Sequence, residues 1–470
     1  MHRNWERSML MGCVLLAAGV PAWAAGNAAA ARPAMANRNL ARIAAATPIG
    51  GRLRVANVQR PDTGETAAFA LERFEVFTPD AKITVHGDHG DEVLPPPANK
   101  YFRGKVAGRP DSLVFLAVLE DGTAQGMVTE GEAIYLIGGE DQPAAKARRA
   151  PLAMRRIDAG DLKASREEGF SCGNELLPPG QSSLDGPDFM DMAAPAAKTA
   201  KAASTAKAAA YTARVAIETD YEFYAKFNSS TTASTYIGNL IGYASTLYQA
   251  EINTSLAVQS ISLWTTSSDP WTQTTATCSL MEFGRYWNLN KTGVSRSIAH
   301  FMSGRPGSGI AWTGKLCSGA FASSSNCPTV PKDAPWGGDY GFSGGMSGIF
   351  NIASPTVVWD LFSVTHEIGH NFNSPHTHCY NGIGGNASPV DQCRSGETGC
   401  YAGTQSLPGP AGAGSGTLMS YCHLLSGGYS NIALTFGTSH PYGVMPGRVP
   451  SRMSAYVASV AASKPTCLAP

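Results

Sequence analysis

Two histidines and a glutamate lie within five consecutive residues, His366-Glu367-Ile368-Gly369-His370. If this segment is helical, residues four apart lie on one face, and both imidazoles can reach a single metal ion. Glu367 would project beside them, close enough to take a proton from a water molecule. The pattern therefore indicates a metal site with Glu367 as its general base.

A third histidine, His376, follows six residues after His370. It can reach the same metal only if the chain turns sharply after the helix, at a residue that tolerates left-handed backbone angles. Asn373 is such a residue. Three neutral imidazoles and one open position match a catalytic zinc site. We therefore expect one Zn²⁺ ion bound by His366, His370 and His376.

The run 366–376 resembles the elongated zinc motif of the metzincin metalloproteases, and 417–422 resembles their downstream Met-turn. The sequence at 370–372 and the cysteine after the turn favour the adamalysin/reprolysin branch. The resemblance implies an α/β catalytic domain with a mixed twisted sheet, a long active-site helix and a Met-turn. It also implies that Met419 forms an apolar floor beneath the metal, and that proteins or peptides are the substrates.

Three positions differ from the pattern of that branch. Asn373 stands where the motif has glycine, and Thr377 stands where the branch often has aspartate. Tyr421 lies two residues after Met419, a spacing that resembles the astacin and serralysin branches. Such a tyrosine could approach the metal or the oxyanion, or it could be a buried tyrosine with a satisfied hydroxyl.

Two other stretches extend the resemblance. Residues 298–302 and 309–317 resemble the edge strand of the branch and its cysteine. The resemblance implies that an extended substrate pairs with Gly309, Ile310 and Ala311 by β-augmentation. Residues 101–106 and 112–116 resemble the propeptide, which implies that the enzyme is made as a zymogen.

The cysteines divide unevenly along the chain. Of ten in total, eight lie between positions 278 and 467, where an oxidising compartment would make disulfides the default. Cys172 is the odd one, placed ahead of the catalytic region. Its position resembles the cysteine switch of metzincin propeptides, in which a thiolate takes the fourth position on zinc. A disulfide to another cysteine or an inert thiol are the alternatives.

Alternating short apolar runs at 53–58, 82–85, 112–118 and 133–137 predict a β-rich domain over about 50–140. An Ala- and Lys-rich stretch at 193–210 follows and favours a linker over a surface helix. We therefore expect a propeptide over 25–200 and a catalytic domain over 201–470. There, a strand from 212, a helix over 234–252 and a strand over 256–264 predict a β-α-β crossover.

The helix that carries the histidines is expected over 355–372, with Ser354 as its N-cap and Pro355 in its first turn. The stretch 377–416 that follows is rich in Gly, Pro, Ser and Cys. A loop of that length needs covalent staples in a compact domain, and cysteines are available within it. The sequence alone assigns no ligands for a structural Ca²⁺ ion.

The first 24 residues have a basic start, a short apolar run and a small-residue cleavage site, which predict a signal peptide. A membrane anchor and lipid attachment at Cys13 are the alternatives. A zero net charge and only 15% charged residues argue against nucleic acid as the partner. We expect a secreted monomer, extracellular or in transit through a periplasm, without stable membrane insertion.

These features predict a secreted zinc endopeptidase. One rival hypothesis is a catalytically silent binding protein with the metzincin fold, but all three histidines and Glu367 are present. Another is an adhesin in which the N-terminal β-rich domain does the binding. N-terminal sequencing of the mature protein would show whether that domain stays attached, and would thereby distinguish the adhesin from the endopeptidase.

Overall fold

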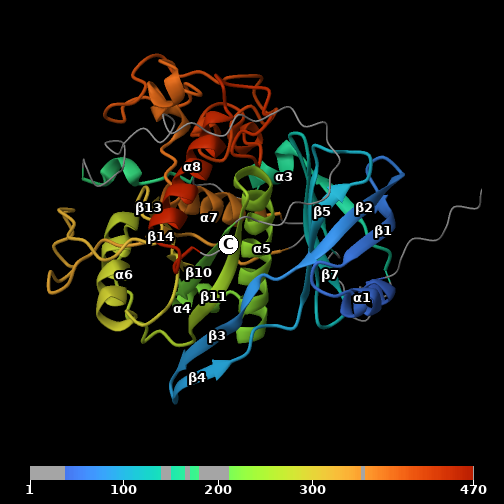
Figure 1. Cartoon of the computed structure of the whole chain (residues 1–470), viewed down its shortest axis with the longest axis horizontal. Helices are drawn as coiled ribbons and strands as arrows, with labels where there is room; N and C mark the ends of the chain where they lie inside the picture. The colour runs from blue at the N-terminus through green and yellow to red at the C-terminus, as the bar shows by residue number, and fades with distance from the viewer. Residues whose placement is uncertain (1–36, 139–149, 165–169, 179–210, 351–354, 469–470) are drawn as a thin grey trace, which may run out of the picture. The chain divides into compact units, whose positions relative to one another are not determined.

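The computed structural model describes residues 37–138, 150–164, 170–178, 211–350 and 355–468 (Figure 1). The expected signal peptide at 1–24 and the Ala- and Lys-rich stretch at 193–210 lie outside these ranges. Within these ranges the strands form two sheets of seven strands each. In the described part of the chain, no helix combines the length and apolarity needed to cross a membrane.

The first sheet is built from the N-terminal part of the chain and is antiparallel throughout. Leu53 and Val55 are buried while Arg52 and Arg54 are exposed, the alternation expected of a strand with one face on a core. Its strands, in spatial order, are β1 (Arg52–Arg60), β2 (Glu65–Phe74), β5 (Lys100–Val106), β6 (Leu113–Val118), β7 (Ala124–Glu130), β8 (Ala133–Ile137) and β9 (Met154–Ile157).

The second sheet is mostly parallel and belongs largely to the C-terminal part of the chain. In spatial order it contains β13 (Gly309–Ala311), β14 (Tyr340–Ser343), β12 (Ile298–Met302), β10 (Tyr211–Thr219), β11 (Thr254–Trp264), β3 (Phe77–Gly87) and β4 (Gly90–Leu94). β10 and β11 are parallel and joined through α5 (Ser230–Ile252), which confirms the predicted crossover. β13 runs antiparallel to β14 at one edge.

Two strands of the second sheet come from the N-terminal half of the chain. β3 pairs with β11 in parallel, and β4 pairs with β3 (Figure 1). The alternation at 82–85 predicted a strand, but not its partner about 180 residues away in sequence. Local periodicity identifies which face of a strand is apolar and carries no information about the neighbouring strand.

Helix α5 lies between the sheets, because it contacts β11 of the second sheet and β5, β6 and β7 of the first. The 15-residue helix α7 (Val357–Asn371) packs against β13 and β14 and is buried along its whole length. The other α-helices are α1 (Asn37–Ala46), α3 (Ala159–Ala164), α4 (Tyr221–Tyr224), α6 (Ala276–Asn290) and α8 (Arg448–Ser463). Short 3₁₀ turns are η1 (Asn174–Leu176), η3 (Thr377–Cys379), η4 (Ile383–Gly385), η5 (Cys422–Leu424) and η6 (Gly428–Asn431).

Helix α7 begins two residues later than predicted. Thr356 is its N-cap and makes no side-chain capping bond, while Ser354 lies outside the described residues. The Val358 N–H donates to the Pro355 carbonyl at 3.1 Å, a bond three residues back. The entry is therefore a tighter turn than an α-helical one, and Pro355 belongs to it.

Candidate metal centre

Helix α7 carries three of the four residues that the sequence singled out for chemistry. His366, Glu367 and His370 are all buried. The Nε2 atoms of His366 and His370 lie 3.1 Å apart, because residues four apart meet on one helix face.

A left-handed turn at Asn373 ends the helix and redirects the chain. Asn373 has a φ of +71°, and its N–H donates to the His370 carbonyl at 2.8 Å. Arg452 of α8 donates from Nε to the Asn373 carbonyl at 2.8 Å and holds the turn in place. The turn lies where the sequence placed it, and it brings His376 back beside the helix, with its ring 4.7 Å from that of His370.

Each of the three imidazoles is oriented by a hydrogen bond from its Nδ1. His366 donates to the Leu418 carbonyl at 2.6 Å, His370 to the Ser374 carbonyl at 2.7 Å, and His376 to the Glu397 carboxylate at 2.9 Å. These bonds set the tautomer in which Nε2 carries the lone pair. All three Nε2 atoms are therefore available as acceptors.

The donor set fits a zinc ion. Two lone pairs that face each other at 3.1 Å repel unless a cation lies between them, and His376 Nε2 has no hydrogen-bond partner. Burial, followed by the neighbouring imidazoles, lowers the pKa of His366 and His370 well below the ordinary value. The rings are therefore neutral, the form that binds zinc.

Glu367 lies against the edge strand β13. Its Oε1 has no hydrogen-bond partner, and burial raises the pKa of its carboxyl well above the ordinary value. A Cβ at Gly309 would lie 2.1 Å from that oxygen, so only glycine fits opposite the carboxylate. A carboxyl with a raised pKa and a free oxygen is suited to accept a proton.

Met419 packs beneath helix α7. A Cβ at Gly369 would lie 2.6 Å from the Met419 sulfur, so the close approach requires glycine at this helix position. The Met419 carbonyl accepts from the Thr377 N–H at 2.9 Å, which ties the segment to the residue after the third histidine.

Cys172 lies directly at the histidine cluster, although it is 194 residues before the first of them. Its Sγ is 3.4 Å from His370 Nε2 and 3.5 Å from Glu367 Oε2. Together with the three histidines, its ligand atom falls in a group whose members lie within 4.8 Å of one another. Burial and then the Glu367 charge raise the pKa of the thiol, whereas a divalent cation among the imidazoles would lower it.

Cys172 is the one free cysteine in the described part of the chain. The eight cysteines after position 200 are paired as Cys278–Cys327, Cys317–Cys467, Cys379–Cys400 and Cys393–Cys422. The expected disulfides are therefore present, and none of them uses Cys172.

The segment around Cys172 lies beside the edge strand, with a parallel bridge between Cys172 and Gly309. The Gly173 N–H donates to the Gly309 carbonyl at 2.8 Å, and the Gly309 N–H donates to the Ser171 carbonyl at 3.2 Å. The Ala311 N–H donates to the Asn174 side chain at 2.9 Å. Gly309, Ile310 and Ala311 thus present their outer edge to residues 171–174, with Ile310 fully buried between them.

Tyr421 is 1% exposed and contacts both parts of the site. Its hydroxyl donates to the Cys172 carbonyl at 2.6 Å, and its ring lies 4.5 Å from that of His376. The Tyr421 hydroxyl therefore has a hydrogen-bond partner, supplied by the segment that lies beside the edge strand.

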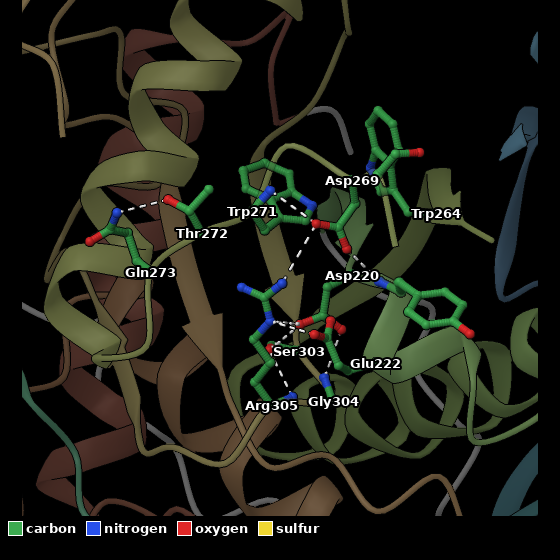
Figure 2. A network of polar contacts seen from close by, with 12 residues as sticks. Asp220, Glu222, Trp264, Asp269, Trp271, Thr272, Gln273, Ser303, Gly304 and Arg305 are labelled. Atoms are coloured by element: carbon green, nitrogen blue, oxygen red, sulfur yellow. Dashed lines mark hydrogen bonds and ion pairs between the residues drawn. The ribbon is translucent and has the colours of Figure 1, made fainter. Parts of the chain in front are cut away.

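The loop that leads into the edge strand is anchored by Arg305 (Figure 2). Its guanidinium lies 2.9 Å from Glu222, 3.6 Å from Asp269 and 4.0 Å from Asp220. Asp220 also accepts from the Gly304 N–H at 2.9 Å and from Phe223 at the start of α4. These contacts fix the connection between β12 and β13.

Sequence reasoning missed Glu397, which lies within 2.9 Å of both His376 and His378. The rings of His376 and His378 are stacked, with their centroids 5.5 Å apart. His423 donates to the Phe170 carbonyl at 2.8 Å and His300 bonds Ser343 at 3.0 Å. The signal that could have located Glu397 is its enclosure by two disulfides, Cys379–Cys400 and Cys393–Cys422.

A match to one family model supports a metallopeptidase. Residues 209–427 match the model described as metallo-peptidase family M12. No curated protein sequence matches the chain. Among solved structures, the metalloproteinase-II of Bacteroides fragilis is 10% identical, with 76% of this chain and 91% of that chain covered and a TM-score of 0.36.

Proposed function

We propose that this chain is a secreted zinc-dependent endopeptidase of the adamalysin-like branch of the metzincins, made as a zymogen. The observation that carries the proposal is the convergence of three Nε2 lone pairs beside the Glu367 carboxylate. In this proposal residues 1–24 are a signal peptide, 25–200 the propeptide and 201–470 the catalytic domain. The segment 417–422 acts as the Met-turn.

His366, His370 and His376 would hold the zinc ion, which supplies a Lewis acid that polarises the scissile carbonyl and acidifies water. Glu367 takes a proton from the attacking water and passes it to the leaving nitrogen. An extended substrate takes the place of residues 171–174 and pairs with Gly309, Ile310 and Ala311.

In this proposal the Tyr421 hydroxyl changes its hydrogen-bond partner when the segment around Cys172 leaves the edge strand. Its hydroxyl donates to the Cys172 carbonyl in the precursor. Once that segment leaves, the same hydroxyl is free to donate to the developing oxyanion.

The first test is casein hydrolysis by the processed protein. Chelation should abolish activity, added zinc should restore it, and Glu367→Ala should be about 10³-fold or more slower, because the variant lacks the general base. A variant that binds zinc with unchanged affinity but is inactive would separate catalysis from metal binding. Full activity in Glu367→Ala would contradict the proposal.

The second test addresses Cys172, which we propose keeps the precursor silent. Its sulfur is 3.4 Å from a nitrogen of the expected metal ligand His370. Cys172→Ser removes the soft ligand and should give an uncleaved precursor that hydrolyses a small peptide substrate. Cys13→Ser is the matched control, because that cysteine lies in the expected signal peptide. A silent Cys172→Ser precursor with bound zinc would count against the switch.

A further inference from the structure

The N-terminal part of the chain completes the second sheet, against which helix α7 packs. β3 pairs with β11 at Phe77 and again from Lys82 to His86, and the Val258 N–H donates to the Val76 carbonyl at 2.7 Å. At the far end the Thr265 N–H donates to the His86 carbonyl at 3.0 Å. Loss of β3 would expose one side of an 11-residue strand, which is a template for aggregation.

The two parts also share one hydrophobic core. Ile83, Val85 and Phe115 belong to the same buried cluster as Ile237 and Ile241 of α5. If the N-terminal and C-terminal parts separated, each would expose apolar surface to water, which is unfavourable.

Two glycines shape α5 to the N-terminal part. A Cβ at Gly238 would lie 3.0 Å from the Phe77 ring, and one at Gly242 would lie 2.5 Å from the Phe115 ring. Glycine in a helix interior costs about 1 kcal/mol of helix stability relative to alanine. The close packing of α5 against these two rings offsets that cost.

Polar side chains also form hydrogen bonds between the N-terminal and C-terminal parts of the chain. Asn239 donates to Gln125 at 2.9 Å, Arg103 donates to Ser255 at 3.0 Å, and Gln259 donates to Asp80 at 3.2 Å. These bonds add geometric specificity to the apolar contact.

We propose that residues 37–164 remain bound after cleavage as a permanent part of the working protease. The piece that leaves is then the short segment 170–178, which carries Cys172 and occupies the edge strand. This inference rests on the proposed function, because it defines what activation removes.

The test uses the full chain with recognition sequences for a site-specific protease inserted at 165–169 and at 195–200. After both cuts, the two large fragments should co-elute in native size-exclusion chromatography, and that peak should carry the caseinolytic activity. Separate elution, with activity in the C-terminal fragment alone, would overturn the inference and leave the protease function standing. Co-elution without activity would support the assembly and count against the protease function.

Matched variants on β3 test the contact itself. Ile83 is 2% exposed and Lys82, beside it, points to the exposed face. Ile83→Asp should raise the apparent dissociation constant of the cut fragments by more than about tenfold, because it buries an unpaired carboxylate. Lys82→Asp should leave it unchanged. Equal dissociation constants for the two variants would show that burial of Ile83 does not hold the fragments together. If Ile83→Asp does not fold, the elution of the cut wild-type chain still decides whether residues 37–164 stay bound.

Discussion

Glu397 bridges two imidazoles, with one oxygen 2.9 Å from His376 Nδ1 and 2.9 Å from His378 Nε2. Burial alone would raise the pKa of Glu397, but its interactions with His376 and His378 outweigh burial and lower that pKa below the ordinary value. The carboxylate therefore orients the His376 ring and increases the basicity of its Nε2 atom. We expect Glu397→Gln to weaken zinc binding by about 10–100-fold, as measured by competition with a chromophoric chelator.

Glu282→Gln serves as the control for that experiment. Glu282 also accepts hydrogen bonds, from Thr272 and Gln273, but it lies outside the metal centre. The zinc affinity of the Glu282→Gln variant should equal that of the wild type. An unchanged affinity in Glu397→Gln would show that His376 needs no carboxylate to hold its orientation.

The edge strand β13 is only three residues long, so its position depends on the elements that hold its ends. Arg305 supplies the positive charge among Asp220, Glu222 and Asp269 at the β12–β13 connection (Figure 2). Arg305→Ala leaves buried carboxylates uncompensated and should cost about 1–3 kcal/mol of unfolding free energy. If substrate pairs with β13, KM should rise several-fold while kcat changes less.

Arg285→Ala is the matched control for Arg305. Arg285 pairs with Asp333 on the surface, where that carboxylate is 55% exposed. Surface pairs of this kind contribute about 0–1 kcal/mol. If both variants had the same KM, the Arg305 contacts would have no role in positioning the substrate.

At the scale of the whole molecule, the central strand β10 carries a buried carboxyl, Glu218. It accepts from the indole N–H groups of Trp264 and Trp287 at 2.8 and 2.9 Å, and burial raises its pKa to about 7. Between its ordinary pKa of 4.5 and about 7, the folded chain binds more protons than the unfolded chain. The unfolding free energy should therefore fall as pH rises through this window, by at most ~1.4 kcal/mol per pH unit.

Denaturant titrations of the wild type and of Glu218→Gln at pH 5, 6 and 7 measure that slope. The variant cannot titrate at this position, so the difference in unfolding free energy between the wild type and the variant should change steadily from pH 5 to pH 7. A constant difference would mean that Glu218 keeps the same pKa in the folded and unfolded chains.

The sequence by itself was enough to identify the helix with His366, Glu367 and His370, because helical spacing places these residues on one face. It also located the turn at Asn373, since few residues adopt left-handed angles, and the β-α-β crossover, since apolar periodicity changes from two to 3.6. Each of these features follows from a local pattern of residue types along the chain.

Only the tertiary structure placed Glu397 beside His376, Cys172 beside His370, and β3 beside β11. These contacts join residues that are 21, 198 and about 180 positions apart. Their geometry depends on disulfides, on packing against α5 and on a shared core, and no local pattern encodes which distant segment fills a given space. The sequence determined which histidines share a helix face, whereas packing of the whole chain decided what orients the histidine cluster and what covers it.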